Sequence, residues 1–154
     1  MLNEICAYLN NWFDINDDHV YLPSWRGQFV IEDGGIDLSG KILDGQYFRI
    51  QNSIFNDGVH KYPAEKGDLQ DEMFTGKIQA MVIPKDLIAL AGEIEEWMEK
   101  NGSASSAAMS PFNSESFAGY SYSKSNGRMA DNESNGMPIW ASVYGGRLAR
   151  WRKL

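Results

Sequence analysis

The stretch Pro84–Gly102, PKDLIALAGEIEEWMEKNG, decides the fold of this chain. Pro84 suits a first helical position, because its missing N–H is not needed there. Asn101-Gly102 supplies residues able to adopt the left-handed conformation that ends a helix. The apolar residues between them recur at helical spacing: Leu87, Leu90, Ala91, Ile94, Trp97 and Met98. The glutamates fall on the opposite, solvent side: Glu93, Glu95, Glu96 and Glu99. The pattern predicts one long helix over about residues 84–101.

The chain before this helix predicts a short helix followed by strands. Residues 2–13 place their apolar side chains on one helical face and predict an amphipathic helix. Residues 19–83 contain short alternating runs bounded by turn signals, and they predict a small antiparallel β module. The expected strands are His19–Leu22, Gly27–Asp33, Gly35–Ser39, Gln46–Ile54, Gly58–Tyr62 and Phe74–Ile83. Gly34-Gly35 predicts a tight hairpin turn, and Asp57-Gly58 predicts a second turn.

The chain after the helix changes in character. Residues 103–137 are rich in small and polar residues and predict a flexible arm, whose aromatic residues suggest that it orders against a neighbour. Residues 138–154 place aromatic and apolar side chains at helical spacing and predict a C-terminal helix. The chain is therefore expected to be α+β, with a compact domain over 1–102 and an interaction arm over 103–154 that ends in a basic, aromatic helix.

Charge is distributed unevenly along the 154 residues. The net charge is −7, yet residues 1–100 hold 8 Lys/Arg and 18 Asp/Glu, whereas residues 101–154 hold 6 and 3. An acidic body disfavours general nucleic-acid binding. The basic end RLARWRKL is open to three interpretations: a solvated tip, a DNA contact or a dock for an acidic neighbour. No apolar run approaches the length of a membrane span and no leader pattern is visible, so we expect a soluble protein without membrane contact.

No grouping of residues predicts catalysis or ligand binding. The single cysteine, Cys6, excludes an intrachain disulfide and is expected to be a buried structural thiol. His19 and His60 are isolated and are expected to be structural rather than metal ligands. Asn56-Asp57-Gly58 lacks the remaining ligand spacing of a calcium loop and predicts a plain turn. We therefore expect no catalytic, metal or cofactor site and no small-molecule substrate, and hence no enzyme.

Four stretches resemble small virion proteins encoded in the structural modules of tailed phages and prophages. They are QYFRIQNSIFNDGVH (Gln46–His60), DEMFTGKIQAMVIPKDLIALAGEIEEW (Asp71–Trp97), SPFNSESFAGYSYSK (Ser110–Lys124) and the ending WASVYGGRLARWRKL. The element from Glu115 to Ser121 is similar to one in helical head–tail adaptors. The chain departs from those mostly helical adaptors in its β module over residues 19–83.

The resemblance implies a non-enzymatic connector or adaptor ring subunit in the neck of the virion. Such a homo-oligomeric ring, which in some cases forms only on the portal, contacts portal and tail proteins and carries DNA only as passing cargo. The protein would be made in the cytoplasm of the host bacterium. Two alternatives remain: a tail-completion or tail-terminator protein, and a DNA-binding accessory protein that uses the basic end. The expected partner-interface residues are Phe112, Glu115, Phe117, Tyr120, Tyr122, Trp140, Arg150, Trp151 and Arg152.

Overall fold

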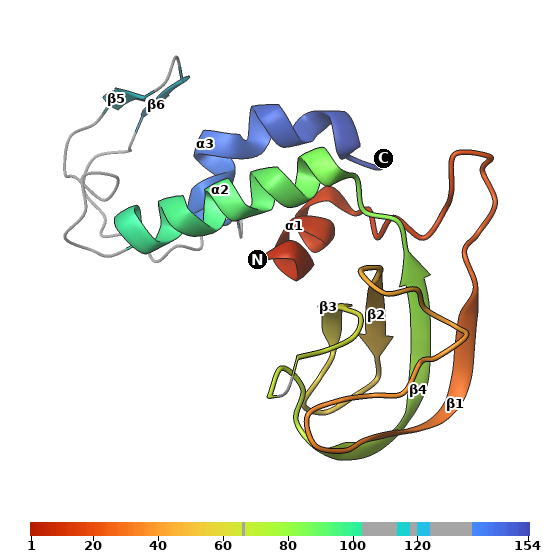
Figure 1. Cartoon of the computed structure of the whole chain (residues 1–154). Helices are drawn as coiled ribbons and strands as arrows, with labels where there is room; N and C mark the ends of the chain where they lie inside the picture. The colour runs from red at the N-terminus through yellow and green to blue at the C-terminus, as the bar shows by residue number, and fades with distance from the viewer. Residues whose placement is uncertain (66, 103–113, 118–119, 124–136) are drawn as a thin grey trace. The chain divides into compact units, whose positions relative to one another are not determined.

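The structure, a computed structural model, describes residues 1–65, 67–102, 114–117, 120–123 and 137–154, the two short segments by their backbone alone. Contacts between residues divide the chain into two compact units. The sheet unit is Leu2–Lys85, and the helical unit is Met1 with Asp86–Leu154. This division falls at the start of the long helix, whereas the sequence analysis expected a boundary after Gly102. The succession of helices and antiparallel strands confirms the predicted α+β class (Figure 1).

Four antiparallel strands form the sheet in the order β1-β4-β2-β3 (Figure 1). Their bounds are β1 Ser24–Ile31, β2 Tyr47–Gln51, β3 Gly58–Lys61 and β4 Glu72–Met81. β4 is the longest strand and pairs on one side with the whole of β1 and on the other with β2. β3 pairs with β2 alone. β4, the last of the four strands along the chain, therefore lies between β1 and β2 and pairs with both.

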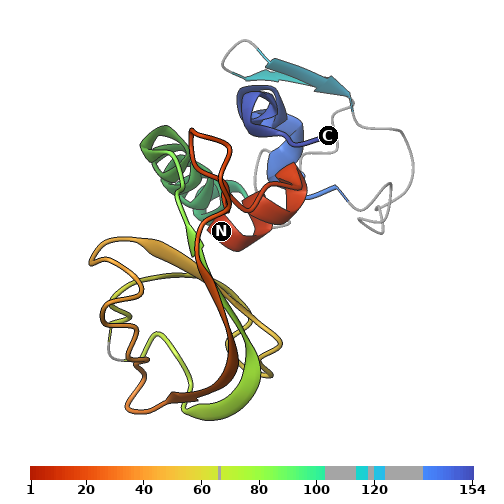
Figure 2. The same cartoon turned by 90° about the vertical axis from the view of Figure 1, so that its right-hand side faces the viewer.

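The core of the sheet unit lies on one face of the sheet. Inward side chains of the strands pack there with apolar side chains from the connecting loops. The buried set is Ile31, Ile36, Leu38, Ile42, Phe48, Ile50, Leu69, Phe74, Ile78 and Ala80. Figure 2 shows the sheet curling around these loops. Burial of this apolar area is the main force that holds the unit together.

Gly76 allows β4 to lie close to β2. A Cβ atom at this position would lie 2.2 Å from the carbonyl oxygen of Gln51 and 3.1 Å from the ring of Phe74. Any larger residue would therefore push the two strands apart, and glycine within a strand often marks such a close approach. The alternating pattern predicts a strand through Gly76 but gives no sign of this packing role.

The predicted strand Gly35–Ser39 is wrong. Glu32 and Gly35 exchange two backbone hydrogen bonds of 3.0 Å, so a tight turn does follow β1. Beyond the turn, Ile36 and Leu38 enter the core instead of pairing with β1, whose partner is β4. The apolar alternation at these positions thus reflects burial of loop side chains in the core and not hydrogen bonding to a neighbouring strand. The predicted strand His19–Leu22 is also wrong, because only an isolated bridge at Tyr21 forms there.

The N-terminal helix α1, Leu2–Leu9, belongs to the sheet unit and is shorter than predicted. Its predicted apolar face is buried at Ile5, Cys6 and Leu9. Asn10 adopts φ +50°, the left-handed conformation that ends helices, so the pattern over residues 10–13 does not continue as helix.

In the helical unit, α2 spans Lys85–Asn101 and matches the prediction closely. Its buried residues are Leu87, Leu90, Ala91, Ile94 and Trp97. At its end the N–H of Gly102 donates to the carbonyl of Met98 at 2.7 Å. α3, Ile139–Leu148, packs against α2, since the rings of Trp97 and Tyr144 meet edge to face with centroids 6.0 Å apart. The short 3₁₀ helix η2, Ala149–Trp151, continues from α3.

Most of the predicted flexible arm lies outside the described residues. Two of its segments are strands, β5 Ser114–Phe117 and β6 Tyr120–Ser123, which pair with each other in antiparallel register. The prediction of loop throughout residues 103–137 is therefore wrong at these eight positions. Their sequences, SESF and YSYS, alternate serine with larger residues, and such alternation is typical of a strand. The prediction of loop relied on the small and polar composition and did not use this alternation.

Candidate partner interface

Four of the predicted interface residues lie on the β5–β6 pair. The register sets Glu115 opposite Tyr122 and Phe117 opposite Tyr120. Phe112 lies outside the described residues. The strand pair thus brings these four positions together along two short neighbouring strands, which the sequence alone did not indicate.

The remaining predicted residues lie on α3 and directly after it. Trp140 is only 1% exposed and is among the largest fully buried side chains, so it contributes to the interior of the folded chain rather than to an exposed surface. Trp151 is half-buried, and the guanidinium of Arg150 lies over its ring at 3.8 Å from the centroid. Arg152 is exposed. The aromatic end is therefore divided between a buried helix face and a partly exposed tip.

Two basic residues of the C-terminal end pair with acids of α2. Arg147 Nη1 lies 2.7 Å from Glu93 Oε2, and its second nitrogen lies 3.2 Å from the other carboxylate oxygen. Hydrogen bonding from Arg147 lowers the pKa of the Glu93 carboxyl. Arg150 lies 3.4 Å from Asp86, with both side chains largely exposed. The sequence analysis treated Glu93 as a solvated residue and missed this pair, because partners 54 residues apart leave no local pattern.

A polar network fixes the loop between β2 and β3 in the sheet unit. Asn56 is 4% exposed, and its amide nitrogen donates to the Gln70 carbonyl and to Glu72, each at 2.9 Å. Its side-chain oxygen accepts from the Gln70 N–H at 2.8 Å. His60 Nε2 donates to the Asn56 carbonyl at 2.7 Å. The predicted plain turn at Asn56-Asp57-Gly58 thus contains a residue of a buried hydrogen-bond network. Each polar group of the Asn56 side chain has a partner in this network.

Burial sets the protonation state of two residues in this unit. Burial lowers the pKa of His60, while the bond to Asn56 acts in the opposite direction. Burial raises the pKa of the Cys6 thiol to about 11, and the nearby Arg49 offsets this only in part. Cys6 is fully buried, as predicted, and is a thiol rather than a thiolate near neutral pH.

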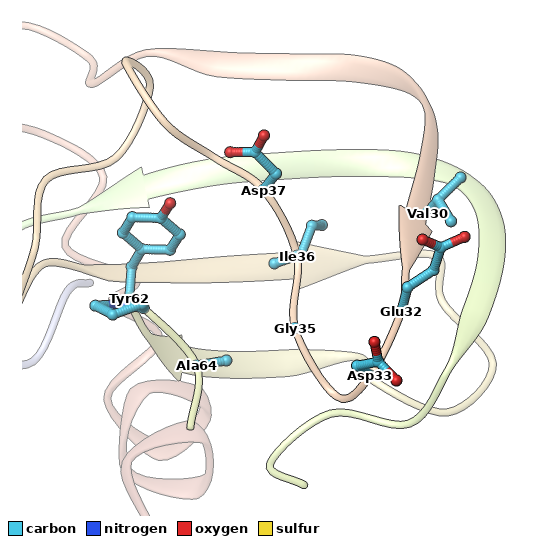
Figure 3. Close-up of a pocket in the computed structure, with 9 residues that line it drawn as sticks. Val30, Glu32, Asp33, Gly35, Ile36, Asp37, Tyr62 and Ala64 are labelled. Carbon is cyan, nitrogen blue, oxygen red and sulfur yellow. The ribbon is translucent and has the colours of Figure 1, made fainter. Parts of the chain in front are cut away.

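An acidic pocket of about 660 Å³ opens beside the end of β1 (Figure 3). Glu32, Asp33 and Asp37 are among its lining residues, and Ile36 and Tyr62 supply apolar lining. All three acids are exposed. Asp37 accepts hydrogen bonds from the hydroxyl and the backbone N–H of Ser39, which lower the pKa of its carboxyl. Among the residues with described side chains, no group of three or more His, Cys, Asp or Glu is placed to hold a metal ion.

A second, basic groove of about 420 Å³ lies on the sheet, where β1 and β4 pair beside the end of β2. Its charged lining residues are Arg26 on β1 and Lys77 on β4. Its other lining residues are Gly27, Gln51, Asn52, Thr75 and Gly76. The sequence analysis assigned no role to any residue of this groove, because its two cations lie 51 positions apart and meet only through strand pairing.

In the part of the chain that the structure describes, no helix is long and apolar enough to span a bilayer. Comparisons of the chain with models of known protein families, with curated proteins and with solved structures found no match.

Proposed function

We propose that the chain is a structural subunit of a tailed-phage or prophage head–tail connector, a ring that joins the portal to the tail and extends the DNA channel. The observation that carries this proposal is the unneutralised negative charge of the sheet unit. The unit holds 13 Asp/Glu and 7 Lys/Arg, a net charge of −6. Eleven of those 13 acids are exposed, and no ion pair joins two of its described residues. Such a surface repels phosphate, which suits a passage through which DNA must move without sticking.

The resemblance to phage neck proteins supports the same function. Its four stretches coincide with the main elements of the fold: β2 with the start of β3, β4 with most of α2, the β5–β6 pair, and α3 with η2. Residues that resemble the phage neck proteins therefore occur in both the sheet unit and the helical unit. A ring subunit must present two different patches to its neighbours, and a chain whose charge is distributed unevenly can offer them.

The alternatives are separated by charge and by position in the neck. A DNA-binding role would use the basic end, yet Arg147 and Arg150 are paired with Glu93 and Asp86. These pairs reduce the positive potential that the end offers to phosphate. A tail-completion role would give the protein the same class of ring but place it at the tail end of the neck.

Reconstitution of the neck tests the proposal. The chain would be mixed with the portal protein and with the tail proteins encoded in the same phage or prophage, and the complexes would be imaged by electron microscopy. We expect rings of the chain on the portal. Rings found only on isolated tails would favour the tail-completion alternative, and failure to join either would refute the proposal. In the absence of the chain, we expect DNA-filled heads without tails.

Charge reversal on α2 tests the channel role. Glu95 and Glu96 are exposed, and neither forms an ion pair within the described residues, so substitution should leave the fold intact. In Glu95→Lys/Glu96→Lys we expect impaired assembly or fewer virions that eject DNA. Glu95→Gln/Glu96→Gln serves as the control, since it removes charge without adding attraction to phosphate. Unchanged infectivity of the lysine variant would contradict a channel-lining role for this face.

A further inference from the structure

The outer face of the sheet carries two opposed cations, Arg26 and Lys77, and neither forms an ion pair with a residue whose side chain is described. The register places Arg26 directly opposite Lys77, and Lys77 is in turn opposite Gln51 on β2. Like charges in this arrangement repel each other and destabilise the pair. No ion pair joins either cation to an acid in the described parts of the sheet unit, despite its excess of acids. An anionic group seated between them would remove the repulsion.

The shape and chemistry of the groove suit a carboxylate from a protein. The facing glycines Gly27 and Gly76 line it and leave backbone accessible beside the two cations. Two rows further along the same face lie Val30 and Met73, a directly opposed pair that is 48% and 65% exposed. Exposed apolar pairs next to charged groups are typical of protein interfaces. An extended polyanion is less suited, because it would also meet the negative charge of the rest of the unit.

The chain itself offers a loop of matching charge. Glu32 and Asp37, with Asp33 between them, are exposed and form no ion pair within the described residues. Arg26 and Glu32 lie on one extended segment about 20 Å apart, at about 3.3 Å per residue, so Glu32 cannot reach the groove of its own copy. Between neighbouring copies this distance does not apply, so the groove of one copy can contact the 32–37 loop of the next.

We propose that the basic groove binds the acidic 32–37 loop of a second copy, as a head-to-tail contact between adjacent subunits. This inference rests on the proposed function, because a contact between two different patches is the kind that closes a ring. A carboxylate of the loop would lie between Arg26 and Lys77, where the guanidinium can bind it through two hydrogen bonds. Val30 and Met73 would be covered by the neighbouring copy.

Disulfide trapping between two variants tests the contact. Full-length Thr75→Cys, which lines the groove and keeps both Arg26 and Lys77, is mixed with full-length Glu32→Cys, whose loop keeps Asp33 and Asp37, under mild oxidation. Thr75→Cys with Asp17→Cys is the matched control, since Asp17 is an exposed acid outside the loop. Cys6 is buried with a pKa of about 11 and does not compete. We expect the mixed disulfide with Glu32→Cys to form about ten-fold faster than the control at low salt. We expect this advantage to shrink at about 0.5 M salt. Equal rates would overturn the proposal.

Reciprocal charge reversal gives an independent test. Arg26→Glu/Lys77→Glu should lose assembly on the portal, and Glu32→Lys/Asp37→Lys should lose it as well. All four substitutions in one chain should restore assembly, because the signs of both patches are exchanged together. A simple folding defect would not be repaired in this way. Failure of the combined variant to recover, while circular dichroism shows that it is folded, would refute the contact.

The outcomes separate this inference from the proposed function. If the natural chain forms rings on the portal and the reversed variants do so equally well, the connector function stands and this contact is wrong. If the natural chain joins neither portal nor tail, the connector function itself is wrong. Salt-sensitive binding of a DNA duplex that Arg26→Glu/Lys77→Glu abolishes, together with equal trapping rates, would assign the groove to nucleic acid and overturn the proposal.

Discussion

Replacement of Gly76 by alanine tests the close packing of β4 against β2. The added Cβ would lie 2.2 Å from the carbonyl oxygen of Gln51, over 1 Å closer than an ordinary contact of about 3.4 Å or more. To relieve this clash, β4 must move away from β2 near Gln51 and Lys77, which form the last pair between the two strands. Overpacking of this kind costs about 1–3 kcal/mol. Loss of one ladder hydrogen bond adds about 1 kcal/mol. We therefore expect Gly76→Ala to lower the free energy of unfolding by about 3 kcal/mol.

Urea unfolding followed by circular dichroism measures this change, with Gly35→Ala as the control in the same unit. A Cβ at Gly35 would lie 3.8 Å from the Glu32 carbonyl oxygen, an ordinary contact, and its φ is not in the left-handed region. The control should therefore be neutral or stabilise by up to about 1 kcal/mol, through a less flexible unfolded chain. If Gly76→Ala and Gly35→Ala change the unfolding free energy equally, the close approach of β4 and β2 is wrong.

Two further predictions concern the network around Asn56. Asn56→Ala should lower the free energy of unfolding by about 2–4 kcal/mol in the same assay, because it removes three hydrogen bonds of a buried side chain. A loss below about 1 kcal/mol would contradict the network. Because burial lowers the pKa of His60, the unfolded chain takes up a proton at higher pH than the folded chain does. The stability contributed by neutral His60 is thus fully present above its unfolded pKa of about 6.5 and is lost as pH falls through the folded pKa. His60→Gln should flatten the decline of the urea midpoint between about pH 7.5 and pH 5 relative to the natural chain. Equal slopes in His60→Gln and the natural chain would exclude a contribution from His60.

The elements that the sequence predicts best are those whose pattern is local. α2 combines a proline start, an apolar stripe and an Asn-Gly end, and all three are properties of neighbouring residues. β2 and β4 show alternation with one buried face, and their predicted positions are correct within a few residues. Helix α1 was overestimated because the apolar pattern continues through Trp12 and Phe13, whereas the backbone leaves the helix at Asn10.

The pairing of strands could not be predicted in the same way. Alternation indicates which face a residue occupies but not which strand lies beside it. The turn after β1 suggested a hairpin with Gly35–Ser39, yet β1 pairs with β4, which lies about 40 residues later in the chain. The longer partner gives β1 eight paired positions and leaves Ile36 and Leu38 to fill the core. The opposed cations Arg26 and Lys77 are a consequence of that same pairing, so the groove could not be predicted either.

The distribution of ion pairs changes which charges are available for partners. The sequence favoured the basic end, where Arg150 and Arg152 stand beside Trp151 with no acid nearby in the chain. In the fold, acids of α2 already face Arg147 and Arg150. Exposed pairs such as that of Arg150 contribute little stability, about 0–1 kcal/mol, but they do reduce the local field. The sheet unit has no corresponding compensation among its described residues, although it carries most of the net charge of the chain. Electrostatic recognition by this protein is therefore expected to depend mainly on the sheet unit, where Arg26 and Lys77 are the cations that a neighbouring acidic loop would neutralise.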